Sequence, residues 1–236
     1  MMSRIDEYLA ERDEDRKIRL PNYYYVTDLT KPCLRQAYYN IIEDRRFPIE
    51  TLRIFEAGNI LEDYWVKILD KDPNIRVLGT QFPAYYVEDE LIIHGRVDVL
   101  TQTNRNMIVA HEVKTASSCH WMKNPKPEHL KQIQFYLSCL DIENGVIDYL
   151  DKSALLRGEN VIDISFPVKR DKTVAEEMIQ HALTLKSHVD AKEIPEGNPE
   201  AWGGRICGYC LYKDLCDSLP RIKNVPQVTE NDTKDT

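Results

Sequence analysis

The spacing of apolar residues divides the chain into helical and β-rich stretches. Apolar positions recur at helical intervals over residues 51–69, 127–140 and 172–191, so each stretch is predicted to form a helix. One face of the first helix is predicted to be buried, and it comprises Ile54, Gly58, Leu61, Trp65, Ile68 and Leu69. Two shorter helices are expected, a charged one over residues 4–17 and one over residues 32–39 with a proline near its start.

Between the first two long helices the pattern changes to short runs rich in β-branched and aromatic residues. They follow Gly79 and include Phe82, Tyr85, Val87, Leu91, Ile93, Val97, Val99, Ile108, Val109 and Val113. Such runs predict an antiparallel meander, and two further strands are expected at 146–150 and 161–168. Helices, meander, helix, strands and helix in this order predict an α/β fold. A mixed central sheet would be flanked by helices, without the regular alternation of a Rossmann fold.

The same pattern predicts five segments along the chain. They are an N-terminal helix with a tyrosine-rich lead (1–26), a segment with the first cysteine (27–50), the sheet-containing core (51–191), a cysteine-rich segment (192–219) and a polar, disordered tail (220–236). The sequence contains no glycine-rich phosphate loop, so an ATP-driven motor is not expected.

Composition and charge narrow the setting. With 42% hydrophobic residues in 236, the chain can bury one substantial core. No apolar run approaches the ~20 residues that span a bilayer, and the charged start does not resemble a secretory signal. A cytoplasmic protein is therefore expected. The net charge of −8 argues against a broad surface that coats nucleic acid, yet it allows a local basic groove.

Two short motifs carry candidate chemistry. Gly-Arg-Val-Asp ends at Asp98, His-Glu-Val-Lys-Thr contains Glu112 and Lys114, and a polar turn lies between them. If the hairpin folds symmetrically about Arg105, Asp98 lies opposite Glu112, and such cross-strand partners are close together. Lys114 is two residues from Glu112 and shares its face. Carboxylates bind Mg²⁺ or Mn²⁺, and such an ion can activate water against a phosphodiester. The residues alone also fit an ordinary hairpin with surface salt bridges.

The cysteines form a second constellation. Cys207 and Cys210 make a C-x-x-C motif, Cys216 follows six residues later, and Cys33 lies far upstream. Disulfides are unusual in an intracellular chain, whereas four thiolates suit zinc or an iron–sulfur cluster. Spacing alone does not separate these two metals, and it also allows unrelated buried cysteines beside a redox pair.

The acidic and basic motifs resemble those of PD-(D/E)XK nucleases. Asp98 followed by Glu112-x-Lys114 is similar to the catalytic core of that superfamily. The resemblance implies that Asp98, Glu112 and Lys114 are catalytic. Gln132 and Tyr136 match the Q-x-x-x-Y motif of the RecB-like branch, and their spacing puts them on one helical face. In that branch the pair helps to hold DNA.

The RecB-like branch also has an earlier G-x-x-x-H motif whose histidine binds the metal. Here Gly58 begins that motif and Glu62 replaces the histidine. A carboxylate is still a competent ligand for Mg²⁺ or Mn²⁺. The resemblance therefore implies a metal site made by Glu62, Asp98 and Glu112.

The cysteine layout is similar to that of the iron–sulfur group of RecB-like nucleases, which have one cysteine before the nuclease core and three after it. The AddB-type nuclease and the CRISPR-associated RecB-like exonucleases (Cas family four) share this layout, and residues 31–39 are similar to the N-terminal cysteine motif of the latter. The resemblance implies a (4Fe-4S) cluster that joins the two ends of the chain, with ligands Cys33, Cys207, Cys210 and Cys216.

The function that the resemblance implies is a metal-dependent DNA exonuclease that prefers single strands, cuts 5′ to 3′ and works with the CRISPR integrase during adaptation. Exposed aromatic residues could stack on bases, and the candidates are Tyr23, Tyr24, Tyr25 and Trp121. Three alternatives stay open. They are a repair or viral RecB-like nuclease, a catalytically weak DNA-binding or scaffold subunit, which the Glu62 replacement would favour, and a zinc-stapled protein without a role on DNA.

Overall fold

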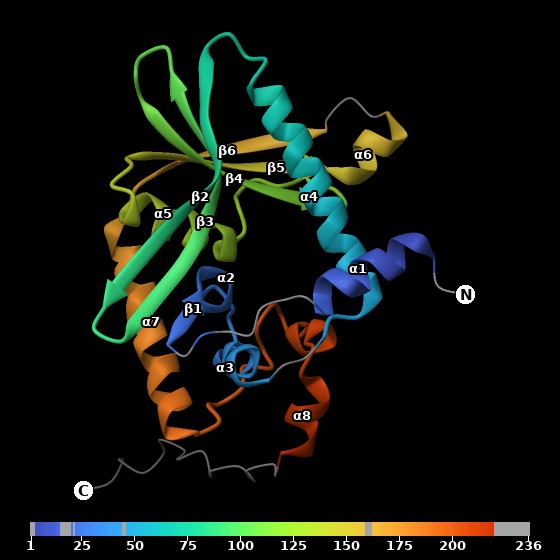
Figure 1. Ribbon diagram of the computed structural model, residues 1–236, viewed down its shortest axis with the longest axis vertical. Coiled ribbons are helices and arrows are strands. Elements are labelled where there is room, and N and C mark those ends of the chain that lie inside the picture. The colour runs from blue at the N-terminus through green and yellow to red at the C-terminus, as the bar shows by residue number, and fades with distance from the viewer. Residues whose placement is uncertain (1–2, 15–19, 21, 44–45, 159–161, 220–236) are drawn as a thin grey trace, which may run out of the picture.

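The computed structural model describes residues 3–14, 20, 22–43, 46–158 and 162–219. A six-stranded mixed sheet lies between helices (Figure 1). Its strands are β1 (Tyr23–Tyr25), β2 (Ile75–Glu88), β3 (Leu91–Thr103), β4 (Ile108–Ala116), β5 (Asn144–Asp151) and β6 (Asp163–Lys169). The helices are α1 (Arg4–Glu14), α2 (Val26–Leu29), α3 (Leu34–Ile42), α4 (Ile49–Leu69), α5 (Pro127–Cys139), α6 (Lys152–Arg157), α7 (Lys172–Ala191), the 3₁₀ helix η1 (Ile206–Tyr209) and α8 (Lys213–Ser218).

The predicted α/β architecture is confirmed. The three long helices α4, α5 and α7 lie where the apolar periodicity predicted them, and β2, β3 and β4 form the predicted antiparallel meander. The predicted first helix is α1 as far as Glu14, and its residues 15–17 lie outside the described residues, as does the predicted disordered tail at 220–236. Among the described residues, no helix combines the length and hydropathy needed to cross a membrane.

Strand β3 organises the sheet. Strand β2 pairs with it antiparallel from end to end along one edge. On the other edge, β1 pairs in parallel with residues 92–94 and β4 pairs antiparallel with residues 99–102. Strand β4 then pairs in parallel with β5, and β5 pairs antiparallel with β6. A strand has two edges, so residues 95–98 of β3 face an opening between β1 and β4, with no partner strand among the described residues.

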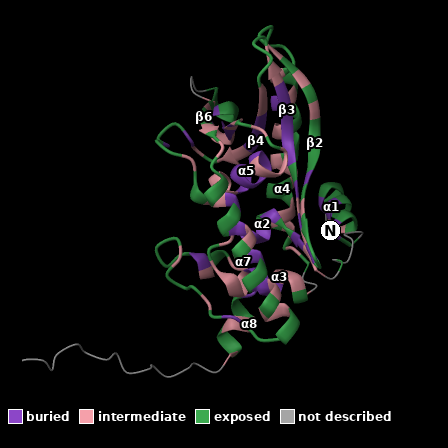
Figure 2. Cartoon of the chain, turned by 90° about the vertical axis from the view of Figure 1, so that its left-hand side faces the viewer, coloured by how far each residue is buried: buried purple, intermediate pink, exposed green. Residues whose placement is uncertain are grey.

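Two hydrophobic clusters pack on opposite faces of the sheet. Residues 132–137 of helix α5 are all buried, and its Ile133 and Leu137 join α7 residues such as Leu185 in the larger cluster. The smaller cluster is formed by Trp65, Val99, Val113 and Leu150, with Trp65 supplied by α4. Figure 2 shows the buried residues concentrated on β3 and α5, between the more exposed β2 and the surface helices. The sheet therefore has α5 and α7 on one side and α4 on the other.

The predicted buried face of α4 is only partly correct. Trp65 is the one buried residue described on this helix, and Leu61 packs beside it. Ile54 is 58% exposed and Ile68 is 37% exposed. The first half of α4 contacts α1 instead of the sheet, through an ion pair of Arg53 with Asp6. The apolar side chains in this half of α4, such as Ile54, are consequently not covered by a hydrophobic core.

Helix α3 lies beside the C-terminal segment that carries η1 and α8, below the sheet in Figure 1. The Tyr39 ring of α3 lies 5.5 Å from the Tyr212 ring, between centroids. The Arg35 guanidinium donates to the Pro195 carbonyl over 2.8 Å. Segments separated by about 160 residues are thereby joined in one packed unit.

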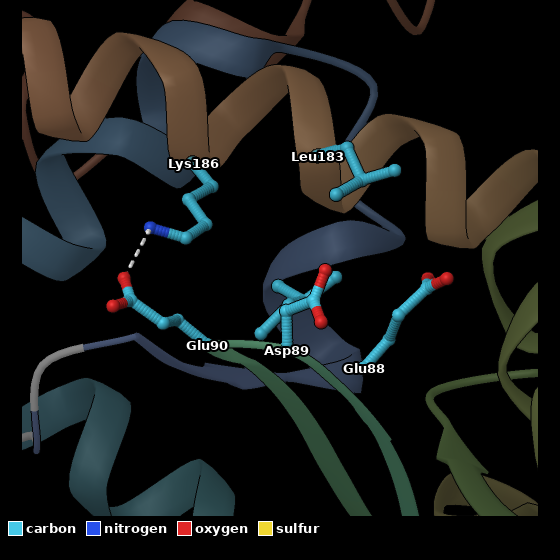
Figure 3. Close-up of a pocket in the computed structure, with 6 residues that line it drawn as sticks. Glu88, Asp89, Glu90, Leu183 and Lys186 are labelled. Carbon is cyan, nitrogen blue, oxygen red and sulfur yellow. Dashed lines mark ion pairs between the residues drawn. The ribbon is translucent and has the colours of Figure 1, made fainter.

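The tip of the β2–β3 hairpin is held against α7. Figure 3 shows Lys186 of α7 reaching toward Glu90, and their ion pair measures 3.9 Å. The same ammonium contacts Asn22 Oδ1 at 3.2 Å and Asp190 at 2.6 Å. This contact fixes the end of β3 that lies remote from Asp98. The pocket shown in Figure 3 is therefore separate from the opening beside β4, and it is lined by Glu88, Asp89, Glu90, Leu91, Leu183 and Lys186.

Candidate active site

The opening beside β3 gathers side chains from five elements. Asp98 lies at the end of the opening where β3 begins to pair with β4. The register pairs Val99 with His111 and Leu100 with Ala110, and one further step along it brings Asp98 opposite Glu112. Asp98 Oδ2 accepts a hydrogen bond from the Val113 backbone N–H at 2.7 Å. The hairpin thus places the two carboxylates as its symmetry about Arg105 predicted.

Glu112 and Lys114 lie on the same side of β4. The Lys114 ammonium forms an ion pair with Glu112 Oε1. Glu112 is completely buried, whereas a quarter of the Lys114 side chain remains exposed. No donor in the described part of the chain reaches Glu112 Oε2. A fully buried carboxylate oxygen without a donor is costly unless a cation approaches it.

Glu62 enters the same region from α4, and Gln81 enters it from β2. The Gln81 amide Nε2 donates to Glu62 Oε1, and Gln81 also hydrogen-bonds Asp98. Burial and the charge of Asp98 raise the pKa of Glu62 to about 7. The three predicted metal ligands Glu62, Asp98 and Glu112 therefore interact electrostatically in one place.

The charges in the opening perturb one another strongly. Burial, followed by repulsion from Asp98, raises the pKa of Glu112 to about 8. Burial likewise raises the pKa of Asp98. Burial alone would lower the pKa of Lys114, but Glu112 and Asp98 outweigh it and the pKa is raised. Crowded carboxylates of this kind bind protons or cations in preference to remaining bare.

Helix α5 closes the opening from the side of the larger cluster. The Gln132 amide donates to Tyr136 Oη at 3.0 Å, and that hydroxyl also accepts a hydrogen bond from the backbone of Arg96. The Tyr136 ring lies directly against Gly95, where a Cβ would be 2.7 Å from Tyr136 Oη. Only a glycine lets the ring come this close to β3. The packing of Tyr136 of α5 against the strand that carries Asp98 therefore depends on Gly95.

At neither predicted metal site do the described side chains form a complete coordination shell. Within the described ranges, no group of three or more His, Cys, Asp or Glu side chains is arranged to hold a metal ion. The donor set of Glu62, Asp98 and Glu112 nevertheless fits a hard divalent cation, because such ions take carboxylate oxygens. The donorless Glu112 Oε2 is the atom that such an ion would satisfy.

The four predicted cluster cysteines gather where the chain ends meet. Cys210 and Cys216 each interact electrostatically with Cys33 and Cys207. Burial raises the pKa of Cys210 and of Cys216. Hydrogen-bond donors face three of the sulfurs. They are Asn198 N on Cys33 Sγ at 3.4 Å, the Tyr212 backbone on Cys210 and the Arg35 side chain on Cys216.

The aromatic residues considered for base stacking divide into two groups. Tyr24 is 1% exposed, so its interpretation as a stacking residue is wrong, because strand alternation turns it into the core. Tyr23 and Tyr25 lie on the opposite face and pack around His94. Trp121 is 66% exposed on the loop that follows β4.

Sequence reasoning missed three residues that shape the site. Gln81 sits in a β-rich run with no motif around it, and Gly95 was noted only as part of Gly-Arg-Val-Asp. The third is Asp148 of β5, whose Oδ2 contacts His111 Nδ1 at 2.8 Å and Trp65 Nε1 at 3.1 Å. A buried histidine next to a candidate catalytic strand predicts such a carboxylate partner, but its position on β5 is a tertiary fact.

A mixed α/β sheet whose opening collects carboxylates and a lysine has the groups that metal-assisted phosphodiester hydrolysis uses. The model of the PD-(D/E)XK nuclease superfamily matches residues 21–217, and the chain belongs to that superfamily. No curated protein matches the sequence.

Solved structures with the same fold include SSO0001, with 20% identity and a TM-score of 0.65 over 92% of this chain and 98% of that one. They also include LHK-Exo, an alkaline exonuclease from Laribacter hongkongensis. Its complex with dAMP is 13% identical with a TM-score of 0.52, over 79% of this chain and 93% of that one. At these low identities the structural likeness shows a shared fold alone, and the superfamily match identifies the chain as a nuclease.

Proposed function

We propose that this nuclease is a metal-dependent DNA exonuclease that prefers single strands and trims DNA ends. The observation that carries the proposal is the convergence of Asp98, Glu112 and Lys114 at the opening beside β3. Their mutual electrostatic interactions, with Glu62 included, concentrate negative charge around one point. A divalent cation is the natural complement of that charge.

Glu62, Asp98 and Glu112 would hold Mg²⁺ or Mn²⁺, and the ion would supply an acidified water and charge stabilisation for the phosphate. The protein's own groups have separate tasks. The Val113 N–H holds the Asp98 carboxylate in place. The Lys114 ammonium, partly open to solvent, is available to a phosphate oxygen or to the attacking water. Gln132 orients the Tyr136 hydroxyl beside the same carboxylates.

Cationic groups next to the opening support a DNA partner. His129, near the start of α5, is kept neutral by burial and by the nearby charges of Lys114, Lys126 and Lys31, which together lower its pKa to about 2. Three ammonium groups thus lie around one end of α5, beside the carboxylates. Such a local patch attracts a phosphate backbone although the net charge is −8. The exposed Trp121 on the adjoining loop suits stacking on an unpaired base.

The proposal includes 5′ to 3′ polarity and a place in CRISPR adaptation together with the integrase, as the resemblance to the Cas family four nucleases implies. LHK-Exo, which shares the fold, is an alkaline exonuclease that was solved with dAMP. That supports action on DNA ends in general. It suits a repair or viral nuclease equally, and the genes beside the coding sequence would separate these roles.

We further propose a (4Fe-4S) cluster bound by Cys33, Cys207, Cys210 and Cys216. The proximity of the four thiols supports it, as do the donors that face three of the sulfurs, because hydrogen bonds to sulfur accompany and tune cluster ligation. The cluster would join chain ends that already pack together, and we assign it a structural role.

The exonuclease proposal is tested with single-stranded DNA labelled at either end, digested with Mn²⁺, with Mg²⁺ and with EDTA. We expect cleavage only with a divalent ion. The 5′-labelled strand should release short labelled products at once, while the 3′-labelled strand shortens progressively. Release from the 3′ label first would overturn the polarity. Metal-supported binding without any cleavage would favour the scaffold alternative.

The cluster proposal is tested by purifying the protein without oxygen and measuring iron, sulfide and zinc. We expect about four irons and four sulfides per chain and absorption in the visible. The Cys210→Ala variant should lose the colour and melt earlier, whereas Cys139→Ala should keep both. A colourless protein with one zinc per chain would overturn the cluster and favour the zinc alternative.

A further inference from the structure

Gln81 occupies an unusual position in the sheet. Its neighbours on β2, Thr80 and Phe82, pair with Val99 and Val97, so Gln81 lies directly across from Asp98. Its φ is +51°, in the left-handed region, although paired residues flank it on both sides. Side chains with a Cβ avoid this region, and those that enter it most readily are the short Asn and Asp. A glutamine held there within a strand marks a position where function outweighs backbone preference.

The side chain shows what this backbone conformation achieves. The amide Nε2 donates to Glu62 Oε1 of α4, and Gln81 also hydrogen-bonds Asp98 of β3. One neutral amide therefore contacts two carboxylates that belong to different elements. An amide donates hydrogen bonds without carrying a charge of its own, so Gln81 adds no positive charge beside the two carboxylates. A lysine in the same place would instead act as a counter-ion and compete with a metal.

We propose that Gln81 is a positioning residue that holds Glu62 against Asp98, so that both carboxylates present free oxygens to one divalent ion. This inference rests on the proposed function, because it assumes that Glu62 and Asp98 are metal ligands. Helix α4 lies outside the sheet, and the Gln81 amide is the described hydrogen bond that ties Glu62 to the strands. Without it, Glu62 would be free to turn away from the repulsion of Asp98.

A merely structural tie between α4 and β2 makes a different prediction from a positioning role. The Gln81→Met variant keeps the size of the side chain and the backbone demand but removes the amide. The Gln81→Gly variant removes the amide and also relaxes the backbone, because glycine accepts positive φ. If Gln81 is only a structural tie, both variants should melt earlier than wild type in EDTA while their Mn²⁺ affinity stays unchanged. If it positions ligands, both variants should fail in metal binding.

The test measures Mn²⁺ binding by titration calorimetry on the full chain without DNA, together with the melting temperature in EDTA. For Gln81→Met and Gln81→Gly we expect the Mn²⁺ dissociation constant to rise 10- to 100-fold, the range found when groups that orient metal ligands are removed. The melting temperature of Gln81→Gly in EDTA should stay within about 3 °C of wild type. The control is Gln102→Met, which makes the same change on the neighbouring strand β3. It should leave Mn²⁺ binding unchanged.

Cleavage kinetics supply a second readout. Both variants should lower kcat at a fixed Mn²⁺ concentration, with KM for DNA changed little, and excess Mn²⁺ should restore part of the rate. Wild-type Mn²⁺ affinity in Gln81→Met and Gln81→Gly would overturn the positioning role while leaving the proposed function intact. A wild-type protein that binds no Mn²⁺ would overturn both, so the two failures are distinguishable.

Discussion

Glu112 is the residue whose surroundings set the chemistry of the opening. It is fully buried, one of its carboxylate oxygens has no donor among the residues that the structure describes, and its neighbours are another carboxylate and the Lys114 ammonium. Any one of these features is common in proteins. Their combination at the divergence of β1 and β4 leaves a charge that the protein alone does not satisfy, which is the physical basis for expecting a cation there.

The first prediction concerns the three residues at the centre of the site. Asp98→Ala, Glu112→Ala and Lys114→Ala should each reduce the cleavage rate at least about 100-fold, since each removes a charge that acts on the reacting phosphate or its ion. The measurement is the initial rate on end-labelled single-stranded DNA with Mn²⁺. Lys67→Ala, an exposed lysine on α4, is the control and should cut normally. Wild-type rates in all three variants would refute the site.

The second prediction concerns the contact between Gly95 and Tyr136. Gly95→Ala should lower the free energy of unfolding by about 1–3 kcal/mol, because the added Cβ meets the Tyr136 ring and forces it or the strand to move. Gly79→Ala is the matched control on β2, since nothing lies within 4 Å of its added Cβ. Urea unfolding measures both, and equal stability of the two variants would contradict the tight contact.

At the scale of elements, a buried polar network fixes β4 between its neighbours. Asp148 of β5 accepts from Trp65 of α4 and from Ser165 of β6, and it contacts His111 of β4. The other ring nitrogen of His111 lies 3.0 Å from Thr101 Oγ1 of β3. Residue 111 thus faces away from the opening, and its network holds the strand that carries Glu112 in register with four other elements.

The third prediction tests this network. Asp148→Ala should lower the free energy of unfolding by about 3 kcal/mol or more, because it leaves buried donors on Trp65 and Ser165 without an acceptor. The exposed Asp163 on β6 provides the control, and Asp163→Ala should change stability by less than about 0.5 kcal/mol. Chemical denaturation in EDTA is the measurement. A small loss in Asp148→Ala would show that water can replace the carboxylate.

The helices and strands also show which structural features a local sequence pattern can predict. The periodicity of α5 and α7 was sufficient to locate them, because each buries a continuous apolar stripe against its neighbours. The three-residue strand β1 was not predicted, because its parallel pairing with β3 joins residues about 70 positions apart. The prediction of a buried apolar face on α4 was only partly correct, since the first half of the helix meets α1 and solvent. Local patterns report that a face is apolar but not what covers it.

At the scale of the whole molecule, the carboxylates of the opening link stability to pH and to metal. The pKa values of Glu62 and Glu112 are raised from 4.5 to about 7 and about 8. The folded protein therefore binds these protons more tightly than the unfolded chain does. Their contribution is most favourable below about pH 4.5 and is lost as the pH rises toward 8.

The fourth prediction follows from that linkage. In EDTA, the melting temperature should fall between about pH 5 and pH 8, and Mn²⁺ should raise it more at pH 8 than at pH 6, because the ligands must be deprotonated to bind. Glu112→Gln should flatten the upper part of the fall, since it removes the group with the highest of these pKa values. Thermal denaturation across this range provides the measurement, and a rise in EDTA would contradict the sign.

The sequence by itself determined the α/β class, the long helices, the hairpin that sets Asp98 against Glu112, and the motifs of the PD-(D/E)XK superfamily. All of these depend on residues close together in the chain, where periodicity and turn symmetry are sufficient. Only the tertiary structure decided that β1 and β4 divide one edge of β3, that Gln81 joins Glu62 to Asp98, and that the chain ends meet around the cysteines. Those features depend on packing between segments that are distant in the sequence. A local pattern indicates that a surface is apolar or polar, but it does not indicate which distant segment packs against it.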